Sequence, residues 1–183
     1  YFSNCIDNIS KVFVINAALL SKVYFHRLVV PLSLIISNLI AFGIQFGILI
    51  LVIAAYAVSG EYFHPTAWLA LLPVLLVILA GYALGGGIIV CALTTRYRDL
   101  FFLVTFGTQL LMYLTPVIFP LSALSGNYRW VAGLNPLAPV FEAFRLGFLG
   151  VGTVTLGQIA VTFVVMVVVL VGGIVLFSRA ERT

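Results

Sequence analysis

Apolar stretches separated by short charged segments run along the whole chain. Asp, Glu, Lys and Arg are absent from residues 28–60, 62–95, 100–128 and 146–178. A spanning helix needs about 20 apolar residues to cross a hydrocarbon core about 30 Å thick, so each stretch has room for one span. Lipid offers backbone groups no partner, and the stretches lack the alternation of barrel strands. The pattern predicts an all-α polytopic membrane protein with four complete spans, at 30–56, 68–93, 99–115 and 153–177.

The composition agrees with this pattern. Charged residues make up 8% of the chain and hydrophobic residues 63%, whereas a soluble domain carries about a quarter charged residues. A soluble domain is therefore excluded. Cys5 and Cys91 lie in apolar or neutral surroundings, and we expect free thiols. Residues 1–15 are too few and too polar for a complete span, and we expect them to be the cytoplasmic end of an earlier one.

The basic residues predict the orientation. If the spans alternate in direction, Arg129 and Arg145 lie on one side of the membrane and the other basic residues lie on the opposite side. These are Lys11, Lys22, Arg27, Arg96, Arg98, Arg179 and Arg182. The excess marks the cytoplasmic side, which holds the N-terminal loop, the turn at 94–98 and the C-terminus. The net charge of +4 forms no basic stripe, so we expect no nucleic-acid partner.

Candidate catalytic chemistry is sparse. Neither lysine follows a glycine, so the chain lacks the Gly-Lys-Ser/Thr sequence that holds nucleotide phosphates, and we expect it to bind neither ATP nor another cofactor. His26 and His64 are predicted on opposite sides of the membrane and cannot share a metal. We also expect no ionisable residue at the middle of a span, which argues against proton-driven pumps and intramembrane hydrolases. A transport role is favoured over catalysis.

Two local patterns concern helix contacts. Residues 16–23 can form a short helix, with Asn16 as N-cap and Lys22 near its C-terminal end. This helix is either an interfacial loop helix or a lever that docks on a cytoplasmic partner. The pairs Gly43-x-x-x-Gly47 and Gly81-x-x-x-Gly85 permit close approach of neighbouring helices.

The outer segment around Pro116 and Pro120 predicts broken helices. Two prolines four residues apart cannot sit in an ordinary continuous helix, yet their flanks remain apolar. Such a stretch is typical of re-entrant half-helices. Asn135-Pro136 is expected to begin a second short helix, on which Glu142 and Arg145 could pair. The alternative is a folded external cap with no gating role.

Three aromatic residues share one face of the predicted span at 99–115. Phe102, Phe106 and Tyr113 are spaced by four and seven residues. Aromatic faces suit sugar rings, because the C–H groups of the sugar pack against the π surface. These side chains could line a channel for sugars or face lipid, and the sequence leaves both interpretations open.

Five sequence blocks resemble those of ABC-type polysaccharide and polyol-phosphate export permeases. Residues 20–31 (LSKVYFHRLVVP) are similar to the family's loop after the second span, usually Ile-Lys-Lys-Val-x-Phe-Pro-Arg, with His26 in place of the proline. Residues 95–100 (TRYRDL) resemble the turn before the fifth span. Residues 114–120 (LTPVIFP) resemble Thr-Pro-Val-x-Tyr-Pro, with Phe119 in place of the tyrosine. Residues 134–137 (LNPL) and 179–183 (RAERT) match as well, in the family's order.

The resemblance implies a six-span half-transporter in the bacterial inner membrane, with earlier spans preceding Tyr1. It would dimerise with a second copy of itself and bind two copies of an ABC ATPase, which uses ATP and Mg. By this resemblance, residues 16–25 would form the coupling helix and residues 116–150 would form the external gate. The cargo would be an undecaprenyl-linked polysaccharide such as O antigen, or a capsular or teichoic polymer. Membrane lipids surround the spans.

The candidate site residues fall into four groups. Those for ATPase coupling are Asn16, Ala17, Leu20, Lys22, Val23, Phe25 and Arg27, and those of the cytoplasmic turn are Arg96, Arg98 and Asp99. The gate group is Pro116, Phe119, Pro120, Asn135, Pro136, Glu142 and Arg145, and the channel-lining group is Phe102, Phe106 and Tyr113. Rival functions are export of a drug or another lipid, a passive channel, or a polytopic glycan-assembly enzyme, for which Glu61 and His64 are the candidates.

Overall fold

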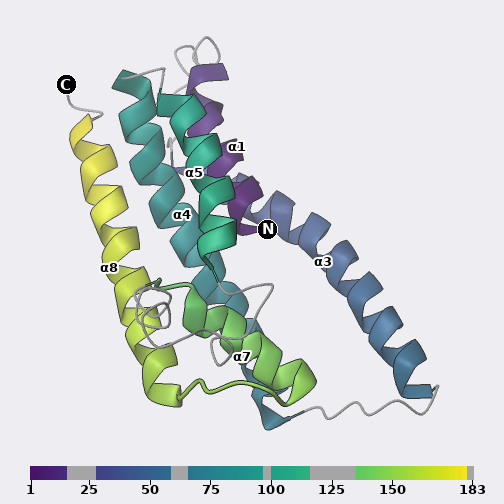
Figure 1. Ribbon diagram of the computed structural model, residues 1–183. Helices are drawn as coiled ribbons and strands as arrows, with labels where there is room; N and C mark the ends of the chain where they lie inside the picture. Colours follow the sequence, from purple (N-terminus) through teal and green to yellow (C-terminus); the bar gives the residue numbers. More distant parts are fainter. Residues whose placement is uncertain (16–27, 59–65, 97–99, 116–134, 181–183) are drawn as a thin grey trace. The chain divides into compact units, whose positions relative to one another are not determined.

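The computed structural model describes residues 1–15, 28–58, 66–96, 100–115 and 135–180, and every regular element in these ranges is a helix (Figure 1). The α-helices are α1 (Phe2–Ile15), α3 (Val29–Val58), α4 (Leu72–Arg96), α5 (Leu100–Leu114), α7 (Ala138–Leu149) and α8 (Leu156–Ala180). A 3-10 helix, η1 (Ala67–Leu71), leads directly into α4. The all-helical fold follows from apolar segments whose backbone groups must be satisfied within the segment.

Three helices are long and apolar enough to cross a membrane. They are Val29–Tyr56, Ala67–Thr94 and Leu156–Arg179, which fall on three of the four predicted spans. The fourth predicted span holds α5, which is apolar and whose 15 described residues extend about 22 Å; residues 97–99 before it are not described. The polytopic helical class is confirmed, with three helices of full spanning length among the described residues.

The structure divides into two compact units, which we describe separately. Unit 1 comprises Tyr1–Ile40, Ala80–Leu111 and Met166–Thr183, and unit 2 comprises Ala41–Leu79 and Met112–Val165. Unit 1 therefore holds α1, the start of α3, most of α4, most of α5 and the end of α8. Unit 2 holds η1, α7 and the remaining parts of α3, α4, α5 and α8.

The core of unit 1 forms around α4. Buried residues of three helices make up one apolar cluster: Cys5 and Ile9 from α1, Ile35 from α3, and Ala83 and Cys91 from α4. Both cysteines are free thiols, as their surroundings predicted. In Figure 1, α1 lies beside α4, and this agrees with the contact of Gly87 with Ile9.

Glycines set the distance between α4 and α8 in unit 1. A Cβ added to Gly85 would lie 2.8 Å from the Cα atom of Leu170, and one added to Gly173 would lie 2.7 Å from the carbonyl oxygen of Gly85. Only hydrogen fits between these two backbones, so the Gly81-x-x-x-Gly85 pair does permit the close approach that its spacing predicts.

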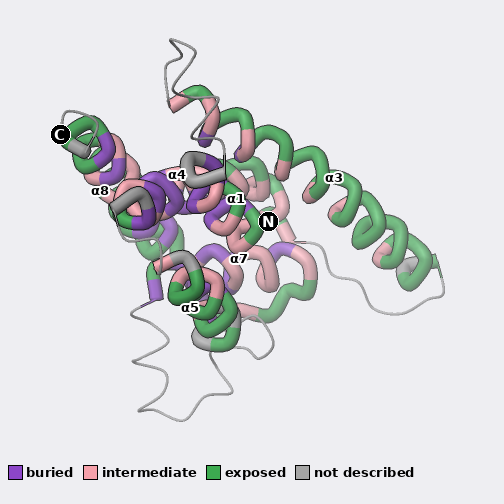
Figure 2. Tube along the Cα trace, turned by 90° about the horizontal axis from the view of Figure 1, so that it is seen from above, coloured by how far each residue is buried: buried purple, intermediate pink, exposed green. Residues whose placement is uncertain are grey.

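Helix α3 has a different environment. In its most apolar 18-residue window no residue is buried inside the chain, whereas half of the corresponding window around α4 is buried. Figure 2 shows the contrast as a mostly exposed tube for α3 and a largely buried one for α4. Within the described residues, Gly43 and Gly47 have no neighbouring atom within 4 Å of an added Cβ. The close approach predicted for this second pair therefore has no partner in the part of the chain that the structure describes.

Candidate transport site

The beginning of α7, in unit 2, is fixed by Asn135. Its side-chain oxygen accepts a hydrogen bond from the backbone N–H of Leu137 at 3.0 Å, and its Nδ2 donates to Oγ1 of Thr115 at 2.9 Å. Asn135 and Thr115 are both buried. The side chain thus closes a local turn and ties the entry of α7 to the residue that follows α5.

This turn corrects the predicted start of α7. The sequence placed the start of the helix at Asn135-Pro136, but α7 begins at Ala138 and the first-turn proline is Pro139. Pro136 lies exposed in the turn before the helix. The reason is that Pro139 has no N–H to donate to the Asn135 carbonyl, so the first bond between residues four apart runs from Phe141 to Leu137.

The end of α7 is held by the segment that enters η1. The hydroxyl of Thr66 donates to the carbonyl oxygen of Leu146 at 2.7 Å, and the Thr66 backbone N–H donates to the carbonyl of Gly147 at 3.1 Å. The Gly147 carbonyl is one that a helix leaves open at its C-terminus, whereas the Leu146 carbonyl also accepts the Gly150 N–H at 3.1 Å. Gly150, with φ of 68°, then ends α7 in the left-handed conformation that glycine adopts without strain.

A buried ion pair lies along α7. Nη1 of Arg145 donates to Oε1 of Glu142 at 3.1 Å, and the side chains are 14% and 3% exposed. The spacing of three residues predicted this pairing. Removing the arginine would take away this ion-pair partner of a buried carboxylate, which is costly inside unit 2. A Cβ on Gly152 would lie 3.1 Å from the Glu142 carbonyl oxygen, so the return from α7 to α8 passes close to this pair.

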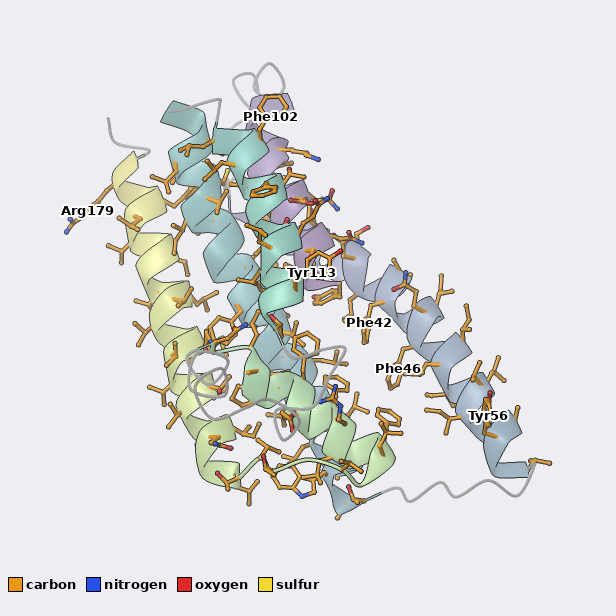
Figure 3. All side chains as sticks on the ribbon, in the orientation of Figure 1. Phe42, Phe46, Tyr56, Phe102, Tyr113 and Arg179 are labelled. Atoms are coloured by element: carbon orange, nitrogen blue, oxygen red, sulfur yellow. The ribbon has the colours of Figure 1, made fainter. Side chains whose placement is uncertain are left out.

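The aromatic candidates on α5 are open to the surroundings of the chain. Phe102, Phe106 and Tyr113 are 75%, 62% and 68% exposed, and Figure 3 labels Phe102 and Tyr113 near the two ends of the helix. Gln109 falls on the same face, three residues after Phe106, and is also exposed. An exposed face of aromatic side chains with one glutamine suits either a channel wall or a lipid-facing surface. Both interpretations of these residues stay open.

Polar contacts between α1, α3 and α5 in unit 1 escaped the sequence analysis. The Thr108 hydroxyl on α5 donates to the Thr105 carbonyl at 3.0 Å and lies 3.5 Å from Oδ1 of Asp7, and Nδ2 of Asn8 donates to Oδ1 of Asn38 on α3 at 3.4 Å. The signal in the sequence was the spacing of polar residues on α1 by three to four positions. Their partners on α3 and α5 are distant in sequence, so the spacing alone could not identify them.

The remaining candidates lie outside the described residues. These are the whole coupling group (residues 16–27), Arg98 and Asp99 of the cytoplasmic turn, and Pro116, Phe119 and Pro120 of the gate. Arg96 is the last residue of α4, and its side chain is likewise not described. Of the gate group, the structure therefore brings together Asn135, Glu142 and Arg145 on or beside α7.

Taken together, the long apolar helices and the short helix α7, tied at both ends, define a polytopic helical membrane protein of the transport class. The sequence profile of the ABC-2 type transporters matches residues 1–149. The chain belongs to this family and is a multi-pass inner-membrane permease. Permeases of the family work with an ABC ATPase, and they are transport subunits rather than enzymes.

Similar proteins that are named as permeases agree with this assignment. The O-antigen export system permease protein RfbA of Klebsiella pneumoniae is 26% identical over 181 residues, which cover 99% of this chain and 68% of that protein. RfbA of Myxococcus xanthus is 29% identical over 132 residues, covering 71% of the chain and 49% of the relative. The inner membrane transport permease YadH of Escherichia coli K12 is 31% identical over 146 residues, covering 78% and 54%. The resemblance to export permeases is confirmed.

Proposed function

We propose that this chain is the permease subunit of an ATP-driven exporter of lipid-linked polysaccharide, with an O-antigen-type glycan as cargo. The observation that carries the proposal is the alignment with an O-antigen export permease over 99% of the chain. The chain lacks the Gly-Lys-Ser/Thr sequence that holds nucleotide phosphates, so the energy would come from a separate ATPase using ATP and Mg. The functional unit would be two copies of the chain with two ATPase subunits.

In this proposal the coupling residues transmit closure of the ATPases to the spans. The group comprises Asn16, Ala17, Leu20, Lys22, Val23, Phe25 and Arg27, and the predicted cytoplasmic turn adds Arg96, Arg98 and Asp99. An apolar residue such as Leu20 would seat in a cleft of the ATPase, as an amphipathic helix docks in a groove. Loss of that contact would leave ATP hydrolysis active but would stop export through the permease.

A cell lacking its own O-antigen permease provides the test. Wild-type chain, expressed with its ATPase, should restore surface polysaccharide, measured by gel electrophoresis and antibody binding to intact cells. Leu20→Asp and deletion of residues 17–21 should abolish export while ATP hydrolysis continues, and undecaprenyl-linked glycan should remain on the cytoplasmic face. Wild-type export by the deletion variant would refute the coupling role. Accumulation of a small drug, with normal surface glycan, would favour a drug exporter instead.

We further propose that α7 is the described part of an external gate, together with Pro116, Phe119 and Pro120. Support comes from its attachment at both ends: to Thr115 after α5 through Asn135, and to the entry of η1 through Thr66. By the predicted orientation these helix ends lie at the outer surface. A helix held at both ends would move with the spans to which it is bonded.

A role of α7 in gating can be distinguished experimentally from a role in folding alone. Asn135→Ala and Thr115→Val both remove the buried hydrogen bond between these side chains and should each cost about 1–3 kcal/mol of stability. Asn135→Ala also loses the bond from the Leu137 N–H, so the double variant should be little worse than Asn135→Ala alone. If α7 gates, both variants should also alter export in the complementation assay, by more than a variant of equal thermal stability elsewhere. Normal export despite the lowered melting temperature would assign α7 to the alternative, a structural cap.

A further inference from the structure

The polar residues of α1 lie on one face of that helix. Asn4 and Asn8 are exposed, Asp7 and Lys11 are half-buried, and the spacing of three and four residues places them together along the helix. The opposite face is buried in unit 1 and holds Cys5, Ile9 and Val12. Helix α1 therefore presents an apolar face to the core and a polar face away from it.

This polar face meets two other helices. The Thr108 hydroxyl of α5 donates to the Thr105 carbonyl oxygen at 3.0 Å and lies 3.5 Å from Oδ1 of Asp7, and Asn8 donates to Asn38 of α3 at 3.4 Å. The 3.5 Å and 3.4 Å distances are at the long end of the hydrogen-bond range. A carboxylate accepts about four hydrogen bonds and an amide donates two, so these groups have capacity for a further ligand. We call Asp7, Asn8, Asn38 and Thr108 the polar cluster.

The polar cluster lies deep within the span region. Asn38 follows Val29, the first residue of α3, by 38 − 29 = 9 residues, and Thr108 follows Leu100, the first residue of α5, by 108 − 100 = 8. At 1.5 Å per residue these positions are about 14 Å and about 12 Å along their helices, in a hydrocarbon core of about 30 Å. Helix α1 runs beside α5 and places Asp7 next to Thr108 at this level of α5, and the absence of ionisable residues from the middle of the spans stays a prediction.

The exposed residues at the same level of α3 are different. Ile36 and Ile40 are exposed and apolar, as expected for a surface in contact with lipid. A carboxylate and amides at equal depth would be costly to hold in hydrocarbon, and such residues normally mark a site or a water-filled path. Figure 3 shows side-chain oxygen and nitrogen atoms gathered along α1, whereas the visible side of α3 carries mainly carbon.

The chemistry of the polar cluster favours a neutral polyhydroxyl ligand. Asp7 and Asn38 offer acceptors, Asn8 and Thr108 offer groups that donate and accept, and three helices hold them at different angles. Lys11 follows Asp7 by four residues on the same face, so the local charge is balanced. A balanced site has no strong preference for a cation or an anion, whereas neighbouring sugar hydroxyls both donate and accept.

We infer that the polar cluster lines a water-accessible path and hydrogen-bonds the sugar hydroxyl groups of the transported glycan. The nature of the cargo rests on the proposed function, but the accessibility of the cluster does not. The opposing interpretation is that these side chains only join the helices to one another, in which case neither water nor glycan reaches them.

Accessibility is tested with the full chain in membranes that contain the ATPase. Asn8→Cys is compared with Ile40→Cys, its matched control on the exposed apolar face, by labelling with a charged methanethiosulfonate reagent from the aqueous phase. The wild-type chain gives the background, since Cys5 and Cys91 are buried. We expect Asn8→Cys to react at least about tenfold faster than Ile40→Cys, because thiolate formation and reagent access both need water. Equal, slow rates overturn the inference.

Ligand contact is tested in the complementation strain. Glycan production should slow the labelling of Asn8→Cys at least threefold relative to cells that make no glycan, with Ile40→Cys unchanged. Asp7→Leu should lower export about tenfold, because a hydrogen bond to a charged group is lost, and Asp7→Asn should lower it less. Amounts of folded permease and rates of ATP hydrolysis should stay at the wild-type level for Asp7→Asn.

The outcomes separate the two proposals. If the wild-type chain exports glycan but Asp7→Asn and Asp7→Leu export normally and labelling is not slowed, the sugar contact is refuted and the exporter function stands. If the wild-type chain exports no glycan while Asn8→Cys still reacts rapidly, the cargo assignment fails and the water-accessible path stands.

Discussion

The two Gly-x-x-x-Gly pairs of this protein have the same spacing and opposite environments. Around Gly85 the backbone of α8 is so close that an added Cβ would fall 2.8 Å from the Cα atom of Leu170. Around Gly47 no described atom lies within 4 Å of an added Cβ. The motif allows a second helix to pack closely, but the rest of the fold decides whether a second helix lies there.

The same comparison explains the burial of the two helices. Helix α4 is contacted by α1 and α8 and half of its most apolar window is buried, whereas the window of α3 is not buried at all inside the chain. Most exposed positions of α3 are apolar, with Ser33, Ser37 and Gln45 as the polar exceptions, so lipid or another subunit can cover most of this surface at little cost. Replacing each glycine by the same residue, alanine, measures the difference directly.

Gly85→Ala should have the largest effect. The new methyl group would lie 2.8 Å from Cα and 2.9 Å from N of Leu170, so α8 must move away. We expect a net loss of about 1–3 kcal/mol in unfolding free energy, despite the gain in helix propensity. Unfolding in detergent, followed by circular dichroism, measures it. Gly173→Ala opposes the same contact and should cost a similar amount; stability unchanged in both variants would contradict the packing of α4 on α8.

Gly87→Ala should have an intermediate effect. Its Cβ would lie 3.0 Å from three atoms of Ile9, a buried residue of α1, and a branched side chain can yield only slightly. A loss of about 1 kcal/mol is expected. Ile9→Ala should cost less in the Gly87→Ala background than alone, because the shorter side chain makes room for the methyl group. Strict additivity of the two changes, by the same unfolding measurement, would show that the residues are not in contact.

Gly81→Ala should change stability little. The neighbour of its Cβ is the side chain of Met166, with Sδ closest. Methionine is flexible and can rotate aside, so the strain should roughly cancel the gain in helix propensity, leaving a change within about 0.5 kcal/mol. A loss as large as that of Gly85→Ala in the same assay would mean that Met166 is held rigidly.

Gly47→Ala should be neutral or slightly stabilising, by up to about 1 kcal/mol, since alanine favours the helix and nothing described opposes the methyl group. Gly43→Ala is its matched companion. A melting temperature lowered in the isolated chain would contradict the open environment. Raised stability combined with lost export would show that this face of α3 is used in the assembled transporter.

Several features of the fold could be predicted because they depend on local sequence. Long uncharged stretches marked the positions of α3, α4 and α8, and the spacing of Glu142 and Arg145 predicted their ion pair. The start of α7 was placed too early, because Pro139 lacks the N–H that a helix beginning at Asn135 would need. The bond from Thr66 to Leu146 joins residues 80 positions apart and left no local signal.

The sequence by itself determined the class of protein, since a chain with 63% hydrophobic residues and charges confined to short segments can only place its helices in a membrane. The sequence also identified the family, because its blocks of residues, in the family's order, can be recognised without a structure. Only the tertiary structure decided which glycine pair packs and that Asp7 lies beside Thr108. Hydrophobicity acts on each segment separately and is readable from composition, whereas packing and hydrogen bonds depend on which distant segments meet.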